Sequence, residues 1–187
     1  MKNTEMGAGM DGVKSLVFDW GDTLMRDFKE FNGPMHLWPE VAAMPGALDA
    51  LQVVGKKRVI AVATNAIDSR EEEIWLALGR ASLDSLINKV YCFYKIGFLK
   101  PSPEFFKYIL RDQNLKPSEL IMVGDDFEKD IQGANRCDIF GVWLNLNSQE
   151  RRTGKLYDTI HSLNELPSFM ELREAALSKT ANNNIIE

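Results

Sequence analysis

The feature that most constrains the fold of this chain is a series of short apolar runs, each followed at once by polar residues. VIAVAT (59–64) and LIMVG (120–124) show no alternation of polar and apolar side chains. Runs of this kind are typical of strands that are buried on both faces of a sheet. The sequence therefore predicts strands over 13–20, 58–64, 90–94, 120–124, 139–145 and, more weakly, 159–163.

Helical patterns lie between these strands. One carries the acidic run EEE near its start and another begins with a proline, as the helix dipole and the fixed φ of proline favour. Strands that alternate with helices indicate βαβ units. The predicted fold class is therefore α/β, a doubly wound, three-layer Rossmann-like fold with a central parallel sheet. The expected helices cover 47–54, 69–78, 103–112, 128–136 and 166–178.

The length of 187 residues suits one domain. We expect a flexible leader over 1–12, a single domain over 13–178 and a disordered tail over 179–187. The leader contains GAGMDG, which matches GxGxxG in letters. A dinucleotide-binding fingerprint must follow a strand, and this one precedes the first strand, so we do not interpret it as a cofactor site.

Composition narrows the classes of function. The chain is 45% apolar and 26% charged, as in soluble globular proteins. Its net charge of −5 argues against a general affinity for nucleic acid or for an anionic membrane. No apolar run is long enough to cross a bilayer, and the N-terminus lacks the apolar segment of a secretory signal, so a cytoplasmic location is expected. The two cysteines and two histidines do not have the spacing of a zinc site.

Polar residues follow three of the predicted strands. Asp19 and Asp22 come after the first strand, Thr64 and Asn65 after the second, and Asp125–Asp126 after the fourth. In open α/β sheets, ligands bind outside the carboxyl ends of the strands. Carboxylates that meet there repel one another unless a cation lies among them. The sequence therefore predicts a cation site at this edge, with Asp126 expected to serve as a turn or capping residue.

The order of these residues resembles the haloacid dehalogenase-like hydrolase superfamily. In that family an aspartate ends the first strand, with a threonine four residues later, and a serine or threonine ends the next strand. A lysine then precedes a helix, here in LKPSPEFF, and acids follow a further strand, here in VGDDFEKDIQGA. The motif residues of this chain, in family order, are Asp19, Thr23, Thr64, Lys100, Asp125 and Asp130.

The resemblance implies a Mg²⁺-dependent phosphatase that acts through an aspartyl-phosphate on a phosphorylated substrate. Asp19 would be the nucleophile. Asp19, the carbonyl of Gly21 and Asp125 would bind Mg²⁺, which prefers oxygen ligands.

The remaining motif residues would bind the transferred group. Thr64 and the backbone N–H of Asn65 would hold a phosphoryl oxygen, and Lys100 would add a positive charge there. Asp130 would orient Lys100 or a metal-bound water. A plainer interpretation of Thr64 and Asn65 is that they cap the next helix.

The chain departs from the family at the acid–base residue. Family phosphatases usually carry an aspartate two residues after the nucleophile, but Gly21 stands there and Asp22 follows it. Either a shifted loop brings Asp22 into the site, or the proton comes from elsewhere, or is not needed, as in the dehalogenase and phosphonatase branches. The third alternative is a weakly active or non-catalytic module that binds phosphate. His36 is a further candidate acid, because histidine titrates near neutrality.

Neither position at which the family inserts a cap holds enough residues for one. Residues 24–44 leave room for an arm, and residues 66–99 are occupied by a helix and a strand. We expect a member without a full cap, with its site open or closed by a partner in a homo-oligomer. Phe28 and Phe31 of the arm are expected to pack on the domain. Its Arg26 or Lys29 could receive an anion.

A receiver domain is the remaining alternative, because it also places acids, a threonine and a lysine around a phospho-accepting aspartate. Its acceptor would have to follow the third strand. The predicted third strand, 90–94, ends in no aspartate. The hydrolase is therefore the favoured prediction.

Overall fold

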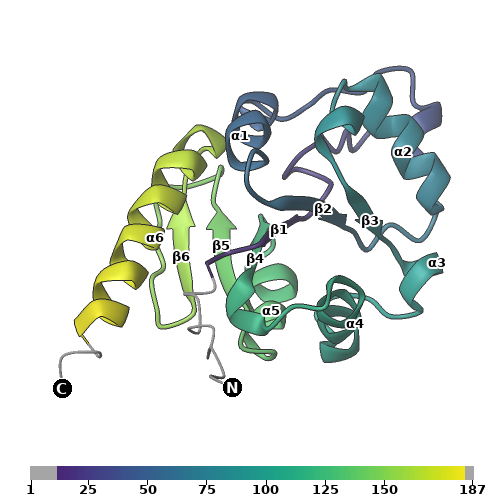
Figure 1. The fold of residues 1–187 in the computed structure, drawn as a ribbon. Coiled ribbons are helices and arrows are strands. Elements are labelled where there is room, and N and C mark those ends of the chain that lie inside the picture. Colours follow the sequence, from purple (N-terminus) through teal and green to yellow (C-terminus); the bar gives the residue numbers. More distant parts are fainter. Residues whose placement is uncertain (1–11, 184–187) are drawn as a thin grey trace, which may run out of the picture.

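Six parallel strands form one sheet in the order β3-β2-β1-β4-β5-β6 (Figure 1). This computed structural model describes residues 12–183, so most of the predicted leader and the last residues of the predicted tail lie outside the described residues. The sheet confirms the predicted fold class. The strands are β1 Ser15–Phe18, β2 Val59–Ala63, β3 Lys89–Tyr91, β4 Leu120–Gly124, β5 Phe140–Leu144 and β6 Tyr157–Ile160.

Helices connect these strands. The α-helices are α1 Ala47–Val54, α2 Glu71–Arg80, α3 Phe93–Ile96, α4 Pro103–Gln113, α5 Gly133–Asn135 and α6 Leu166–Asn183. The shorter helical turns are η1 Met35–Leu37, η2 Asp84–Leu86, η3 Pro117–Glu119, η5 Leu163–Glu165 and η4 Phe127–Gln132, a π-helix. None of the helices in the described range combines the length and apolar composition needed to cross a bilayer.

Three predicted elements differ from the structure. The helix predicted over 166–178 continues to Asn183, so residues 179–183 of the tail that was predicted to be disordered are helical. The predicted strand over 90–94 ends at Tyr91, because the backbone turns at Cys92, whose carbonyl accepts bonds from the first turn of α3. The predicted helix over 128–136 is divided into η4 and α5. The aromatic residues at 91, 93 and 94 favour a strand, so the sequence pattern did not reveal the turn into α3.

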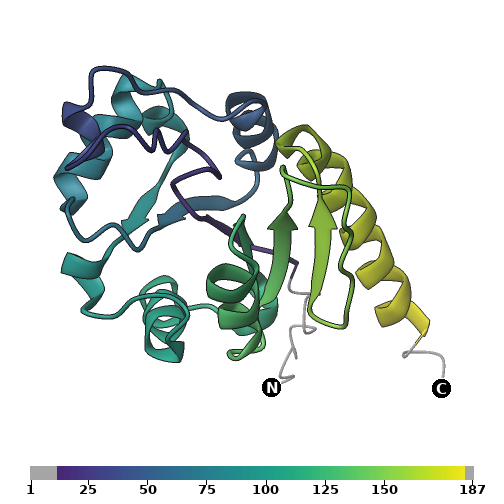
Figure 2. The same cartoon turned by 180° about the vertical axis from the view of Figure 1, so that it is seen from behind.

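The sheet is covered on both faces, which explains the continuous apolar runs. Along β1, Leu16 and Phe18 belong to the apolar cluster that includes side chains of α1, α2 and α6. Val17, between them, belongs to the cluster that includes side chains of α4 and α5. Figures 1 and 2 show these helices in two layers, one on each side of the sheet. Successive side chains of a strand point to opposite faces, so both faces need apolar residues.

The strand order places the predicted site at the carboxyl end of β1. β1 pairs with β2 on one side and with β4 on the other. From β1 the strands β2 and β3 extend the sheet in one direction, and the strands β4, β5 and β6 extend it in the other. A crevice forms outside the carboxyl ends of the strands at such a switch point. Asp19 directly follows β1, and Asp125 directly follows β4.

Residues 24–44 form an arm that leaves and rejoins the domain next to β1. At its base, the Arg26 N–H donates to the Ala42 carbonyl at 2.9 Å, and the Met44 N–H donates to the Leu24 carbonyl at 2.8 Å. The Leu24 side chain is fully buried. The base of the arm is therefore fixed to the core.

The outer half of the arm is held by α2 and by its own aromatic residues. Arg80, the last residue of α2, donates to the carbonyls of His36 at 2.9 Å and Trp38 at 2.6 Å. The ring of Phe31 contacts those of Phe28 and Trp38, with centroids 5.5 and 5.7 Å away. Phe28 and Phe31 pack against the core, as the sequence predicted.

We expect Arg80→Ala to loosen the outer arm without unfolding the sheet. Hydrogen bonds to charged groups contribute about 1.5–3 kcal/mol, so amides of residues 33–39 should exchange with deuterium roughly tenfold faster. The matched control is Arg111→Ala, since Arg111 donates to a carbonyl of its own helix, α4. Unchanged exchange in the arm of the Arg80 variant would show that this arginine does not hold it.

Candidate active site

Lys100 lies at the centre of the polar edge. Its ammonium Nζ is 2.6 Å from an oxygen of Asp19 and 2.6 Å from an oxygen of Asp130. The side chains of Lys100 and Asp130 are each only 2% exposed, and that of Asp19 is 15% exposed. Burial alone would lower the pKa of the Lys100 ammonium, but attraction to Asp130 and Asp19 outweighs burial and raises this pKa above its ordinary value.

The backbone of Lys100 is fixed by the side chain of Asn65. The Asn65 amide donates to the Lys100 carbonyl at 2.8 Å, and its oxygen accepts from the Lys100 N–H at 2.8 Å. This pair of bonds ties the loop after β2 to the loop before α4. Only the backbone N–H of Asn65 was predicted to lie in the site, because one sequence gives no signal for this long-range contact of its side chain.

Asp130 lies on the π-helix η4. One of its oxygens binds Lys100, and the other accepts from the Asp126 N–H at 3.2 Å. Gly124 makes this approach possible, because a Cβ atom there would lie 2.2 Å from the Asp130 carboxylate. Asp126 accepts from the N–H groups of Glu128 and Lys129, which confirms its predicted capping role.

Asp125 is held by hydrogen bonds from two side chains, one in the loop after β1 and one on β5. Its carboxylate accepts from the hydroxyl of Thr23 at 3.1 Å, and its carbonyl accepts from the indole N–H of Trp143 on β5 at 2.8 Å. Thr23 is fully buried. Burial and repulsion from Asp19 raise the pKa of the Asp125 carboxyl to about 6.

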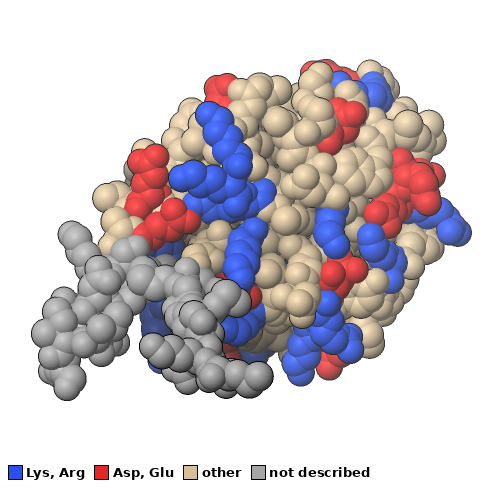
Figure 3. Space-filling view, in the orientation of Figure 1, with Lys and Arg blue, Asp and Glu red and all other residues tan. Residues whose placement is uncertain are grey.

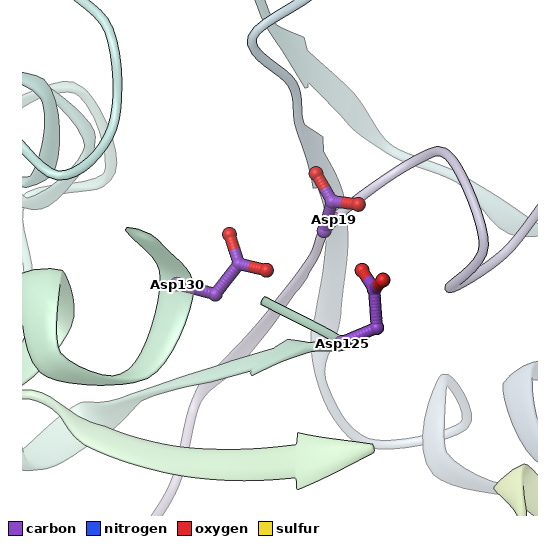
Figure 4. A group of neighbouring side chains, drawn as sticks. All are labelled: Asp19, Asp125 and Asp130. Carbon is purple, nitrogen blue, oxygen red and sulfur yellow. The ribbon is translucent and has the colours of Figure 1, made fainter. Parts of the chain in front are cut away.

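The three carboxylates converge on one space, and Figure 4 shows them arriving from the ends of β1 and β4 and from η4. One oxygen from each of Asp19, Asp125 and Asp130 lies within 4.8 Å of the others. Lys100 binds Asp19 and Asp130, whereas the Asp125 carboxylate is bound by an uncharged hydroxyl. A cation between Asp19 and Asp125 would offset the remaining negative charge.

Thr64 lies at the end of β2 with its side chain 4% exposed. Its hydroxyl oxygen accepts from the Ala66 N–H at 3.0 Å. The helix α2 begins only at Glu71, with Arg70 as its N-terminal capping residue. Thr64 and Asn65 therefore do not cap that helix, and Thr64 faces the same cavity as the carboxylates.

The loop after Asp19 brings the predicted catalytic residue Asp22 to the lining of the same cavity and turns it toward the arm. Asp22 has a left-handed φ of 54°, and its carboxylate accepts from the Asp27 N–H at 3.0 Å. Its other oxygen lies 3.0 Å from the ammonium of Lys29. The predicted anion-binding group Lys29 is thus paired with carboxylates of the arm and of the loop, at 2.5 Å from Asp27.

A cavity of about 370 Å³ opens over these groups. Its floor consists of the strand-end residues Asp19, Gly21, Thr64, Asn65, Lys100, Asp125 and Asp130. The arm contributes a wall made of Asp27, Lys29, Gly33, Met35 and Trp38. Among the described residues that line the cavity, His36 does not appear. The fold thus brings all the motif residues except Thr23 to the cavity surface, and Thr23 supports Asp125 from beneath.

Surface charge is mixed on the face shown in Figure 3, where acidic and basic side chains are interspersed. The cluster of three carboxylates around Lys100 is a local feature that the loops build, and it does not follow from the net charge of −5.

We expect Gly124→Ala to disrupt the site. The added Cβ would displace the Asp130 carboxylate and leave the Lys100 ammonium with one buried partner instead of two. Breaking a buried ion pair costs about 3–5 kcal/mol, which urea denaturation would detect. Gly12→Ala is the control, because a Cβ atom there would have no neighbour within 4 Å. Equal stability of both variants would contradict this account.

The raised pKa of Asp125 makes the metal-free protein sensitive to pH. A carboxyl whose pKa is higher in the folded state binds protons more readily there, so stability falls as pH rises from about 4 through about 6. Asp125→Asn should be more stable than the parent at pH 7.5 in EDTA. The difference should shrink at pH 5, where Asp125 is mostly protonated.

Thermal denaturation of both proteins at the two pH values measures this effect. The asparagine retains an acceptor for the Thr23 hydroxyl, so the comparison isolates the charge. A difference in melting temperature that does not change with pH would rule out the electrostatic explanation.

Comparison with known proteins agrees with this geometry. Residues 21–138 match the haloacid dehalogenase-like hydrolase family. The pyrimidine 5'-nucleotidase YjjG of Escherichia coli is 28% identical over 129 residues, which is 68% of this chain and 56% of the relative. A glyceraldehyde 3-phosphate phosphatase of Pyrococcus furiosus is 32% identical over 54% of this chain and 42% of its own.

A phospholysine phosphohistidine inorganic pyrophosphate phosphatase of Danio rerio is 48% identical over 56 residues, or 30% of this chain and 18% of the relative. The chain thus spans between 18% and 56% of the length of these curated relatives.

Solved structures share the fold. A protein of Listeria monocytogenes serotype 4b superposes with a TM-score of 0.74 at 23% identity, covering 89% of this chain and 99% of that one. A 2-haloacid dehalogenase of Pseudomonas syringae has a TM-score of 0.61 at 25% identity, over 74% of this chain and 57% of its own. Because the family match covers more than half of the residues, and the strand-end residues meet in one site, the chain belongs to the haloacid dehalogenase-like hydrolases.

Proposed function

We propose that this protein is a Mg²⁺-dependent phosphatase that forms an aspartyl-phosphate on Asp19. The observation that supports this most is the arrangement around Lys100, which places one buried cation against Asp19 beside a second strand-end carboxylate, Asp125. Phosphoryl transfer requires positioning and neutralisation of charge more than covalent chemistry from the protein. The site offers both.

The residues fit a magnesium ion. Asp130 is already bound by Lys100 and by a backbone N–H, so Asp19 and Asp125 are the carboxylates left for a metal. The carbonyl of Gly21, which lines the same cavity, is the third protein ligand that we propose. Hard oxygen donors of this kind suit Mg²⁺, which would neutralise charge on the transferred group when bound.

Each remaining residue has a distinct proposed role. Asp19 attacks phosphorus, and the bond to the leaving oxygen breaks. Thr64 accepts a bond from the Ala66 N–H, which leaves its hydroxyl proton to donate to a phosphoryl oxygen. Lys100 offers its positive charge to the same group while Asp130 keeps it in place.

The substrate class that we favour is a small phosphate ester. A cavity of about 370 Å³ with an arm across it suits a small organic molecule better than a folded protein. The names of two of the relatives point the same way, since nucleotides and glyceraldehyde 3-phosphate are small phosphate esters. The side chains of Met35 and Trp38 provide apolar contacts for the organic part.

The test is hydrolysis of p-nitrophenyl phosphate with Mg²⁺ by the parent protein and by Asp19→Asn. The variant should lose turnover to the limit of detection, because an amide is a poor nucleophile and a weaker metal ligand. Asp49→Asn, on the first turn of α1 and outside the cavity lining, is the matched control and should keep full activity.

The result also separates the alternatives. An active Asp19→Asn variant would contradict the proposed mechanism. An inactive parent protein that binds vanadate with Mg²⁺ would favour a phosphate-binding module instead. Release of halide from a 2-haloacid, without phosphatase activity, would favour the dehalogenase chemistry that one structural relative performs by its name.

A further inference from the structure

Cleavage of a phosphate ester through Asp19 needs a group that handles a proton. The leaving oxygen gains a proton in the first step, and the attacking water loses one in the second. Asp19 is the proposed nucleophile, Asp125 is a proposed metal ligand, and Asp130 is the buried partner of Lys100. Lys29 is unsuited because contacts with Asp27, foremost, and Asp22 raise the pKa of its ammonium.

Four other carboxyl groups line the cavity, those of Asp22, Asp27, Asp68 and Asp126. Asp126 caps η4, and Asp68 accepts from the Ser69 hydroxyl at 3.1 Å.

The space beside Gly21 is filled by Asp27 of the arm. A Cβ atom built on Gly21 would lie 3.4 Å from the Cβ of Asp27, 3.8 Å from its Cγ and 3.9 Å from its Oδ2. Gly21 does not have a left-handed φ, so its backbone would also accept a side chain. The Asp27 carboxyl thus occupies the volume that a side chain of residue 21 would reach.

Asp22 helps to hold Asp27 in position. Its carboxylate accepts from the Asp27 N–H at 3.0 Å and contacts Lys29 at 3.0 Å, and Lys29 in turn contacts an Asp27 oxygen at 2.5 Å. These three contacts bind the arm to the loop after Asp19. Asp22 is therefore a positioning residue, and the adjacent carboxyl on the arm faces the cavity with Asp19.

We propose that Asp27 is the general acid and base of the reaction, brought to the site by the arm. This rests on the proposed phosphatase function. In the first step, Asp19 bonds to phosphorus, the ester P–O bond breaks, and the proton of Asp27 passes to the leaving oxygen. In the second step, Asp27 takes a proton from the water whose oxygen attacks phosphorus, and the bond between phosphorus and Asp19 breaks. The enzyme returns to its starting state with inorganic phosphate released.

The test removes the carboxyl of residue 27 and then places a carboxyl at residue 21. Asp27→Asn and Asp27→Ala should lower kcat by about 10²–10⁴-fold with phenyl phosphate, whose leaving group needs protonation. The loss should be smaller with p-nitrophenyl phosphate, but the phosphorylated Asp19 should accumulate and be visible by intact mass spectrometry. Adding Gly21→Asp to Asp27→Ala should restore at least about tenfold of the lost rate, because it returns a carboxyl to the same space.

The control is Glu30→Gln, an exposed acid of the same arm outside the cavity lining, which should leave both activities unchanged. An Asp27→Asn variant within about threefold of an active parent protein would overturn the proposal for Asp27 and leave the phosphatase function standing.

Two further results would also overturn the proposal. In the first, activity is lost without accumulation of phosphorylated Asp19 and without rescue by Gly21→Asp, so Asp27 only holds the arm. In the second, the parent protein is inactive on both esters, and the proposed function fails together with the role of Asp27.

Discussion

The buried ammonium of Lys100 is the group on which the rest of the site depends. Moving a charge out of water costs several kcal/mol, and only close, well-oriented partners offset this cost. Asp130 is as deeply buried as Lys100 and serves as its permanent partner, whereas Asp19 is more exposed and faces the cavity. In the proposed reaction, this asymmetry would let Asp19 exchange its contact with the lysine for one with phosphorus, while Lys100 stays neutralised by Asp130.

The same ion pairs join three segments that are far apart in the sequence. Asp19 follows β1, Lys100 precedes α4, and Asp130 lies in η4. Asn65 adds the loop after β2 through its two bonds to the Lys100 backbone. Because a parallel sheet brings these strand ends to one edge, a few polar contacts are enough to assemble the site on a rigid base.

The strand-end residues could be predicted because two independent signals agreed. Continuous apolar runs located β1, β2 and β4 and the polar residues just after them, and the order of those residues matched a family pattern. The fold class followed from the alternation of strands and helices. Asp126 as a cap was also predictable, because capping is local and depends on residues two and three positions away.

The contacts that the sequence did not reveal are those between distant segments without periodicity. Nothing in the sequence indicates that the Asn65 side chain binds the backbone of Lys100, or that Trp143 supports Asp125. The path of the arm is another example. Its aromatic and charged residues follow neither a helical nor a strand period, so their partners depend on tertiary packing alone.

The position of the arm has a chemical consequence because of Gly21. A carboxyl attached to residue 21 would be placed by the loop after β1, whereas Asp27 is placed by the arm. The proposed proton transfer by Asp27 then depends on the contacts that hold the arm beside that loop. The proposed metal binding and nucleophilic attack depend on strand-end residues and do not need the arm.

The position of the arm therefore matters for the proposed proton transfer and not for the proposed metal site. The arm is held at one end by the contacts among Asp22, Asp27 and Lys29, and at the other by Arg80. A substrate that contacts Met35 or Trp38 would favour the same position of the arm, and by linkage that of the Asp27 carboxyl. In the proposed reaction, recognition of the organic part of a substrate is then coupled to the proton transfer that its leaving group requires.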